Sequence, residues 1–128
     1  MDPEQARIQA DLRGLIQGDV LCDPIHLQIY ASDASIYEIC PLGVVRPKST
    51  AEVSQVMRYA TQNNIKVFPR GGGSGLAGQA LGRGLVIDFS RFMRRVNPPI
   101  GNTIRVQCGV VQADLNRALG QKRLLFGP

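Results

Sequence analysis

The stretch with the clearest chemical potential runs from Pro69 to Gln79, where five of eleven residues are glycine. It directly follows a short apolar segment at 65–68. Glycine adopts backbone conformations that a Cβ atom forbids, and it lets a ligand approach the main chain closely. Successive amides in such a turn can converge into an anion-binding nest, so the pattern indicates a cradle for a diphosphate. A surface loop without a ligand is the alternative explanation.

The spacing of the glycines decides which kind of cradle to expect. Gly73, Gly75 and Gly78 satisfy G-x-G-x-x-G, the pattern of Rossmann dinucleotide-binding folds. That pattern requires the glycines to open a helix, with an acidic residue about twenty positions further on. The segment 79–84 is too rich in glycine for a helix, and the first acid, Asp88, comes too early. A P-loop fails because no Gly-Lys-Ser/Thr follows. A Rossmann-type NAD(P)-binding dehydrogenase stays open as an alternative.

Apolar periodicity and capping residues predict the helix that precedes the loop. Ser49 and Glu52 form a capping box, and Asn63–Asn64 marks the end of the helix. Because this helix connects two short apolar strands, we expect the strands to be parallel, with a right-handed connection. The residues expected on its buried face are Val53, Val56, Met57 and Ala60.

The other predicted elements follow from the same signals. They are a helix from Asp2–Pro3 to Gly18, a short helix at 25–30, an irregular passage at 32–41, strands at 43–46, 65–68 and 85–88, a strand at 103–107 and a helix from 111 to Gly120. The strand at 103–107 alternates, which is typical of one exposed face. The predicted fold class is therefore α/β (α+β), with a small parallel βαβ subdomain and the start of a second, mainly antiparallel subdomain.

Composition restricts the class of protein. The chain has 128 residues, 44% of them apolar and 20% charged, which is ordinary for one globular domain. No apolar run approaches the roughly 20 residues of a membrane span, and the acidic start at 1–4 is not a secretory signal. Cys22, Cys40 and Cys108 are too few and too far apart for a disulfide framework or a metal site, which favours reduced thiols in the cytoplasm. Cys108 is expected to be a small buried residue.

The net charge of +5 raises the question of a nucleic-acid partner. The basic residues, however, are spread from Arg7 to Arg123, and only the segment 91–95 is a cluster. Few aromatic residues lie among them to stack on bases. We therefore expect no nucleic-acid partner. A non-catalytic basic module that binds nucleic acid or protein stays as the second alternative.

Three segments resemble the FAD-binding domain of the vanillyl-alcohol oxidase and p-cresol methylhydroxylase (PCMH) type. Residues 46–53 resemble the opening strand, proline and capped helix of that family, 69–79 its pyrophosphate loop, and 86–91 the strand and turn that follow. The resemblance is closest to FAD-linked glycolate oxidase, D-lactate dehydrogenases and fused FAD/iron–sulfur oxidoreductases. The segment 30–37 is similar to the lead-in of the fused group.

This resemblance implies a domain organisation and a function. It divides the chain into an N-terminal helical lead-in at 1–37 and the incomplete N-terminal part of an FAD-binding domain at 38–128. The complete enzyme is expected to transfer a hydride from a 2-hydroxy acid, of the glycolate or D-lactate class, to FAD. Its electron acceptor is expected to be an iron–sulfur cluster in a missing C-terminal domain, or a membrane carrier at the inner face of the membrane.

The fragment alone is expected to be inactive, because the groups that hold the substrate in the resembled enzymes lie in later domains. No catalytic residue is therefore predicted in this chain. The exposed apolar residues expected at 124–126 predict that the fragment self-associates.

The cofactor-binding residues that the resemblance implies are Pro69, Arg70, Gly71, Gly72, Gly73, Ser74, Gly75, Gly78 and Gln79. The amides from 71 to 75 would hold the pyrophosphate, with the Ser74 hydroxyl as a further donor. Pro69 would fix the entry to the loop. Arg70 is expected either to pair with a phosphate or to form a structural salt bridge.

The resemblance further implies that FAD is bound non-covalently. Some members of the wider fold attach the flavin through a histidine of this loop, and Ser74 stands at that position here. The one histidine, His26, lies far upstream and is expected to be structural. Asp33 and Asp88 are expected to stabilise local turns rather than to contact FAD. No metal ligands are predicted.

Overall fold

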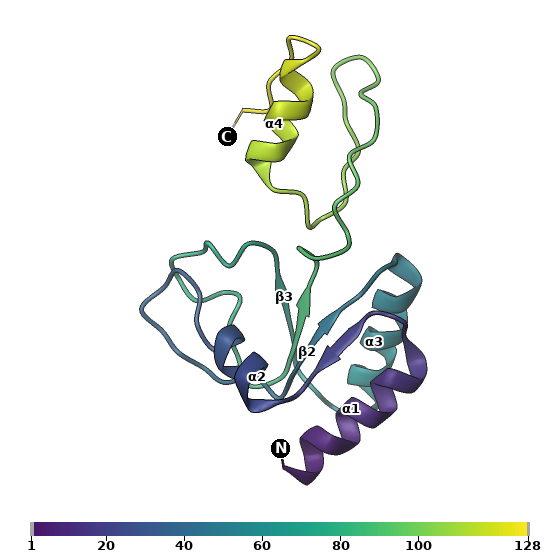
Figure 1. Cartoon of the computed structure of the whole chain (residues 1–128), viewed down its shortest axis with the longest axis vertical. Coiled ribbons are helices and arrows are strands. Elements are labelled where there is room, and N and C mark those ends of the chain that lie inside the picture. The colour runs from purple at the N-terminus through teal and green to yellow at the C-terminus, as the bar shows by residue number, and fades with distance from the viewer. Residues whose placement is uncertain (1, 128) are drawn as a thin grey trace.

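Residues 2–127 are described in a computed structural model, which places a four-stranded sheet at the centre of the N-terminal part (Figure 1). Met1 and Pro128 lie outside the described residues. The strands lie in the order β1 (Asp19–Leu21), β2 (Gly43–Arg46), β4 (Leu85–Asp88) and β3 (Val67–Arg70). Both β2 and β3 pair in parallel with β4, whereas β1 pairs antiparallel with β2. The predicted α/β fold is confirmed, and β2 and β3 are parallel as expected.

The sequence predicted neither the order of the strands nor the antiparallel strand β1, and the structure places β4 between β2 and β3. One predicted bound is wrong: β3 begins at Val67 rather than at Ile65, because Asn64 adopts a φ of 53° and the Ile65 amide still donates to the Ala60 carbonyl at the end of the preceding helix.

The sheet is covered on both faces (Figure 1). Val45 and Ile87 lie in one hydrophobic cluster with residues of α1 (Pro3–Leu15) and α3 (Thr50–Gln62). Val44 and Val86 lie in a second cluster, with Leu27 of α2 (Pro24–Tyr30). Neighbouring strand residues point to opposite faces, so a strand covered on both sides must be apolar throughout. This explains the unbroken apolar runs of β2 and β4.

The predicted starts of the helices are confirmed, with one change at α3. Ser49 caps α3 by accepting a hydrogen bond from the Glu52 amide at 3.3 Å. The Glu52 carboxylate does not return to Ser49. It accepts from the backbone amides of Lys48 at 2.8 Å and Gln17 at 3.3 Å, so it links the end of α1 to the start of α3.

The buried face of α3 is rotated from the predicted one. Val56 and Ala60 are buried as expected, but Met57 is 45% exposed and Tyr59 is buried in its place. The Tyr59 hydroxyl donates to the Asp11 carboxylate of α1 at 2.8 Å. Burial, with a smaller contribution from this hydrogen bond and the Asp11 charge, raises the pKa of Tyr59 to about 12.

Tyr59 should make the stability of the fold depend on pH in alkaline solution. Its folded-state pKa lies above the ordinary value of 10.0, so its contribution is complete below pH 10 and is lost as the pH rises towards 12. We expect the free energy of unfolding of the protein to fall by about 1–3 kcal/mol over that interval through this group. Tyr59→Phe should flatten the decline, measured by urea unfolding at several pH values. An unchanged pH profile in the variant would contradict the assignment.

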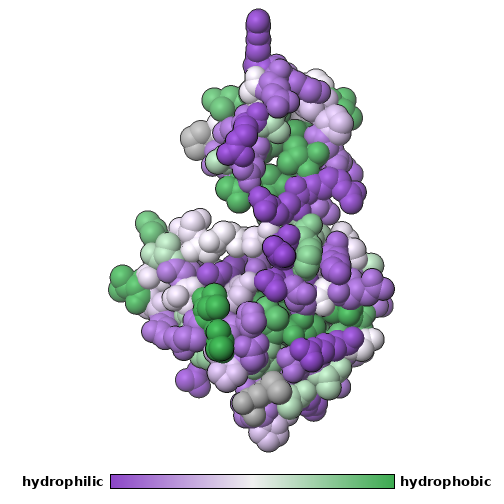
Figure 2. Space-filling view, in the orientation of Figure 1, coloured by the Kyte–Doolittle hydropathy of each residue, from purple (hydrophilic) through white to green (hydrophobic). Residues whose placement is uncertain are grey.

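The chain beyond β4 forms a separate part, joined to the sheet by a narrow neck (Figures 1 and 2). It contains an antiparallel ribbon and the predicted C-terminal helix, α4 (Gln112–Gly120). The strand expected at 103–107 is present only as single bridges, Val96 with Val106 and Ile100 with Thr103. A two-stranded ribbon with no third strand beside it is only marginally stable, which explains the interrupted pairing.

Two further expectations concern exposed side chains. Cys108 was expected to be buried but is exposed, because it lies in the turn after the ribbon rather than in a sheet. Leu125 is 77% exposed and Phe126 is 53% exposed, and self-association through them stays a prediction. Within residues 2–127, no helix combines the length and the apolar character needed to cross a bilayer.

Candidate cofactor site at the glycine-rich loop

The glycine-rich loop leaves the sheet at the carboxyl end of β3 and returns at Leu85, the first residue of β4. In sheets with parallel strands, ligands bind at this end of the strands. No helix begins anywhere between 71 and 84. A Rossmann site needs a helix that opens at its glycines, so the structure does not support the Rossmann alternative.

The backbone amides of Gly71, Gly72, Gly73, Ser74 and Gly75 are the potential donors of the site. None of the five donates a hydrogen bond to an acceptor within residues 2–127. Gly71, Gly72 and Ser74 are exposed, and a Cβ atom built on Gly71 or Gly72 would meet nothing within 4 Å. The loop therefore presents uncommitted amides beside open space, which is the arrangement that binds the oxygens of a phosphate.

Two glycines of the loop need the conformational freedom of glycine, and a third is held by a close contact. Gly73 has a φ of 66° and Gly78 a φ of 74°. A Cβ atom on Gly75 would lie 2.5 Å from Oε1 of Gln79, a side chain that also accepts from the Ala77 amide at 3.3 Å. The Gln79 side chain therefore lies against Gly75 and stabilises the turn at 75–79.

Arg70, the last residue of β3, does not pair with a carboxylate. No carboxylate within residues 2–127 forms an ion pair with it. Its Nη1 donates to the carbonyl oxygen of Ser32 at 2.8 Å and approaches that of Tyr30 at 3.5 Å. The guanidinium also lies 5.2 Å from the centroid of the Tyr30 ring. The structural salt bridge considered from the sequence is therefore replaced by bonds to backbone carbonyls.

The two aspartates near the loop occupy turns, as predicted. Oδ1 of Asp88 accepts from the Ser90 amide at 2.8 Å, and Oδ1 of Asp33 accepts from the Ser35 amide at 2.8 Å. Asp88 is only 4% exposed, and its Oδ2 accepts from the Tyr30 hydroxyl at 2.5 Å. Burial, followed by this bond and the Asp88 charge, raises the pKa of Tyr30 to about 12, so Tyr30 stays a donor at neutral pH.

The structure also brings a segment to the loop that the sequence did not assign to the site. The Ala34 amide donates to the Gly73 carbonyl at 2.9 Å. A Cβ atom on Gly78 would lie 2.8 Å from Cδ2 of Tyr37. The similarity of residues 30–37 to a known lead-in was the only signal in the sequence, and it gave no role for these contacts.

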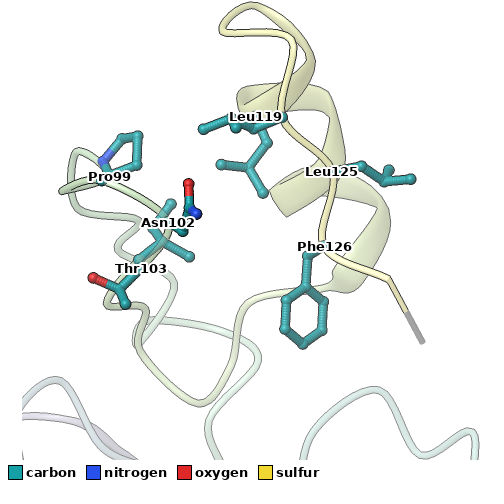
Figure 3. A pocket seen from close by; sticks show the side chains of 9 residues that line it. Pro99, Asn102, Thr103, Leu119, Leu125 and Phe126 are labelled. Carbon is teal, nitrogen blue, oxygen red and sulfur yellow. The ribbon is translucent and has the colours of Figure 1, made fainter.

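His26 and the cavity of the C-terminal part both lie outside the glycine-rich loop. Nδ1 of His26 lies 2.7 Å from the Asp23 carboxylate, the cap of α2. A cavity of about 180 Å³ lies between the ribbon and α4, lined mainly by apolar residues such as Leu119, Leu125 and Phe126 (Figure 3). None of its lining residues belongs to the glycine-rich loop. The described part of the chain contains no group of three metal-ligating side chains.

The FAD-binding domain family model matches residues 41–128, which include the loop and all strands but β1. The chain therefore belongs to the FAD-binding domain family, as its resemblance predicted, and FAD is its cofactor. The uncommitted amides at the end of β3 agree with this assignment.

Two individual relatives show which enzymes of the family this chain is similar to. The chain is 41% identical over 104 residues to D-2-hydroxyglutarate dehydrogenase from Escherichia coli (strain K12), a match that covers 77% of this chain and 10% of that protein. It is 31% identical over 104 residues to the glycolate oxidase subunit GlcD from Bacillus subtilis (strain 168), covering 78% of this chain and 22% of that protein. This chain thus spans a small fraction of the length of its relatives.

A solved structure confirms the fold type. The chain superimposes on p-cresol methylhydroxylase with a TM-score of 0.72 and 16% sequence identity, over 97% of this chain and 26% of that one. At this identity the likeness concerns the fold alone. The predicted PCMH-type architecture is confirmed.

Proposed function

We propose that this chain holds FAD non-covalently at its glycine-rich loop, as part of a larger oxidoreductase that oxidises a 2-hydroxy acid. The observation that carries the proposal is the row of uncommitted amides from Gly71 to Gly75 in a member of the FAD-binding domain family. The names of the relatives, D-2-hydroxyglutarate dehydrogenase and glycolate oxidase, support the substrate class. Their greater length supports a larger protein around this domain.

The proposed roles of the site residues follow from their positions. The amides from 71 to 75 donate to the two phosphates, and the exposed Ser74 hydroxyl adds a donor. Pro69 fixes the backbone at the entry to the loop, and Gly78 and Gln79 form its far wall. When bound, FAD accepts the hydride that leaves the hydroxyl-bearing carbon of the substrate. The residues of this chain bind and orient the cofactor, and we assign no proton transfer to any of them.

The finer proposal concerns the substrate and the electron acceptor. D-2-Hydroxyglutarate, D-lactate and glycolate are the candidate substrates, and an iron–sulfur cluster or a membrane carrier is the proposed acceptor. All three cysteines of the chain are free, which supports a reducing, cytoplasmic setting. Anaerobic mixing of the whole purified protein with each acid tests the substrate class, because the substrate should bleach the flavin absorbance. Bleaching by none of the three acids would contradict the 2-hydroxy acid assignment.

The absence of a covalent link can be checked directly. Ser74 has no nucleophilic ring nitrogen, and His26 is engaged with Asp23 on α2. We therefore expect acid precipitation of the whole protein to release all of its flavin into the supernatant, read by absorbance. Flavin that stays with the pellet would show a covalent attachment at another residue.

The second alternative, a basic module for nucleic acid or protein, receives no support from the relatives. Part of the basic cluster at 91–95 is also already paired. Arg94 lies 2.9 Å from the Asp114 carboxylate, which also pairs with Arg117 at 2.7 Å.

A further inference from the structure

Residues 30–37, which we call the lead-in strap, contact the glycine-rich loop at three separate points. At the start of the loop, Arg70 donates to the Ser32 carbonyl at 2.8 Å. In the middle, the Ala34 amide donates to the Gly73 carbonyl at 2.9 Å. At the far end, the Tyr37 ring lies so close to Gly78 that a Cβ atom there would be 2.8 Å from it. The strap therefore follows the whole length of the loop.

The strap is itself fixed to the sheet below the loop. Tyr30, its first residue, donates from its hydroxyl to the buried carboxylate of Asp88 at 2.5 Å. Asp88 ends β4 directly beside Arg70, its partner in the parallel pairing with β3. The Arg70 guanidinium in turn lies over the Tyr30 ring, 5.2 Å from its centroid. These three side chains hold the root of the strap to the ends of two neighbouring strands.

A loop with this many glycines loses much conformational entropy when it becomes ordered. If such a loop were disordered in the free protein, this loss of entropy would oppose binding of the cofactor. Contacts that order the loop beforehand reduce the cost of binding and so raise affinity. The strap supplies such contacts through the Gly73 carbonyl and leaves the amides of Gly71 to Gly75 free of protein acceptors.

The position of Arg70 fits this role better than a bond to phosphate. Its Nη1 is already committed to carbonyls of the strap. A Cβ atom on Gly73 would lie 2.6 Å from Nη2 and 2.9 Å from Cζ, so the guanidinium lies directly against that glycine. The charge is used to hold two stretches of backbone together.

We propose that the lead-in strap and Arg70 are positioning elements of the FAD site, which hold the glycine-rich loop open for the diphosphate before the cofactor binds. This inference rests on the proposed function. It extends the site to residues 30–37, which precede the segment 41–128 that matches the FAD-binding family. Arg70 is then a positioning residue and not a ligand of the phosphates.

The first test measures hydrogen exchange at the Ala34 amide of the strap in the absence of FAD. In whole protein stripped of flavin, the Ala34 amide should be protected from hydrogen exchange by its bond to Gly73. Arg70→Met removes the link to Ser32 and should increase the exchange rate at Ala34 by about tenfold or more, while the amides of β2 and β4 stay protected. Arg83→Met is the matched control: Arg83 is exposed and forms no ion pair within residues 2–127. Unchanged exchange at Ala34 in Arg70→Met would overturn the inference.

The second test measures FAD affinity and its dependence on salt. Arg70→Met should raise the Kd for FAD by about tenfold or more, and Arg83→Met by less than about twofold. Arg70→Lys should be about as weak as Arg70→Met, because an ammonium cannot reproduce a planar fork stacked on Tyr30. The slope of log Kd against log salt should be the same in Arg70→Met and Arg83→Met, which both lose one positive charge.

The outcomes separate the two proposals. A wild-type protein that binds no FAD would contradict the proposed function itself. Wild-type binding with an unchanged Kd in Arg70→Met would overturn only the positioning role. Near wild-type affinity in Arg70→Lys, together with a smaller salt slope in Arg70→Met, would instead make Arg70 a phosphate ligand and overturn the role inferred here.

Discussion

The Gly73→Val protein is expected to be purified without flavin. Gly73 has a φ of 66°, which a β-branched side chain resists strongly, and its Cβ position already lies 2.6 Å from Nη2 of Arg70. The substitution would therefore turn the peptide unit at the centre of the loop and displace Arg70 from the carbonyl of Ser32. We expect FAD retention to fall below detection, measured as the ratio of flavin to protein absorbance in the whole protein.

The control for this variant is Gly14→Val. Gly14 lies in α1, and a Cβ atom there meets nothing within 4 Å, so the same side chain is added without a clash. This variant should retain flavin like the wild type. Stoichiometric flavin in the Gly73→Val protein would contradict the assignment of the glycine-rich loop to the cofactor site.

Gly84→Ala is expected to destabilise the fold strongly. A Cβ atom on Gly84 would lie 2.2 Å from the Lys66 carbonyl oxygen, and this oxygen accepts the Leu85 amide at 2.9 Å. The clash is therefore with the first rung of the pairing between β3 and β4, where backbone atoms cannot move without breaking the sheet. We expect a loss of about 3 kcal/mol or more in the free energy of unfolding. Urea unfolding followed by circular dichroism measures this loss.

Gly14→Ala gives the comparison, because it adds a methyl group on an open helix surface. It should leave stability unchanged or raise it by up to about 1 kcal/mol. Equal stability of the Gly84→Ala and Gly14→Ala proteins would contradict the close packing of β3 against the residue before β4.

The elements with local signals were predictable from the sequence. Three helices begin at N-cap residues, which are Asp2, Asp23 and Ser49. Each cap is followed by an apolar pattern, so these helices can be recognised from the local sequence alone. The order of the strands is different, because the pairing of β4 with both β2 and β3 depends on contacts between distant segments. The short strand β1 also lacked a signal, since three residues are too few to show a period.

The site was predictable in part for the same reason. Five glycines at the end of a strand indicate free amides whatever surrounds them. What Arg70 does depends on Tyr30 and Ser32, residues about forty positions earlier that only the folded chain brings near. Met57 was wrongly expected on the buried face of α3. Tyr59 is buried instead, and its polar partner, Asp11, lies on another helix, so the sequence of α3 alone could not show it.

Pro69 has a consequence for the outer edge of the sheet. The carbonyls of Lys66 and Arg70 both accept hydrogen bonds from residues at the two ends of β4. Backbone groups alternate in direction along a strand, so the nitrogen of Pro69, next to Arg70, points away from β4 and towards the open edge of the sheet. Proline has no amide hydrogen to offer a foreign strand. Pro69 therefore removes one hydrogen-bond donor from this edge of the sheet, directly beside the cofactor loop, and makes the edge a poorer template for a strand from another molecule.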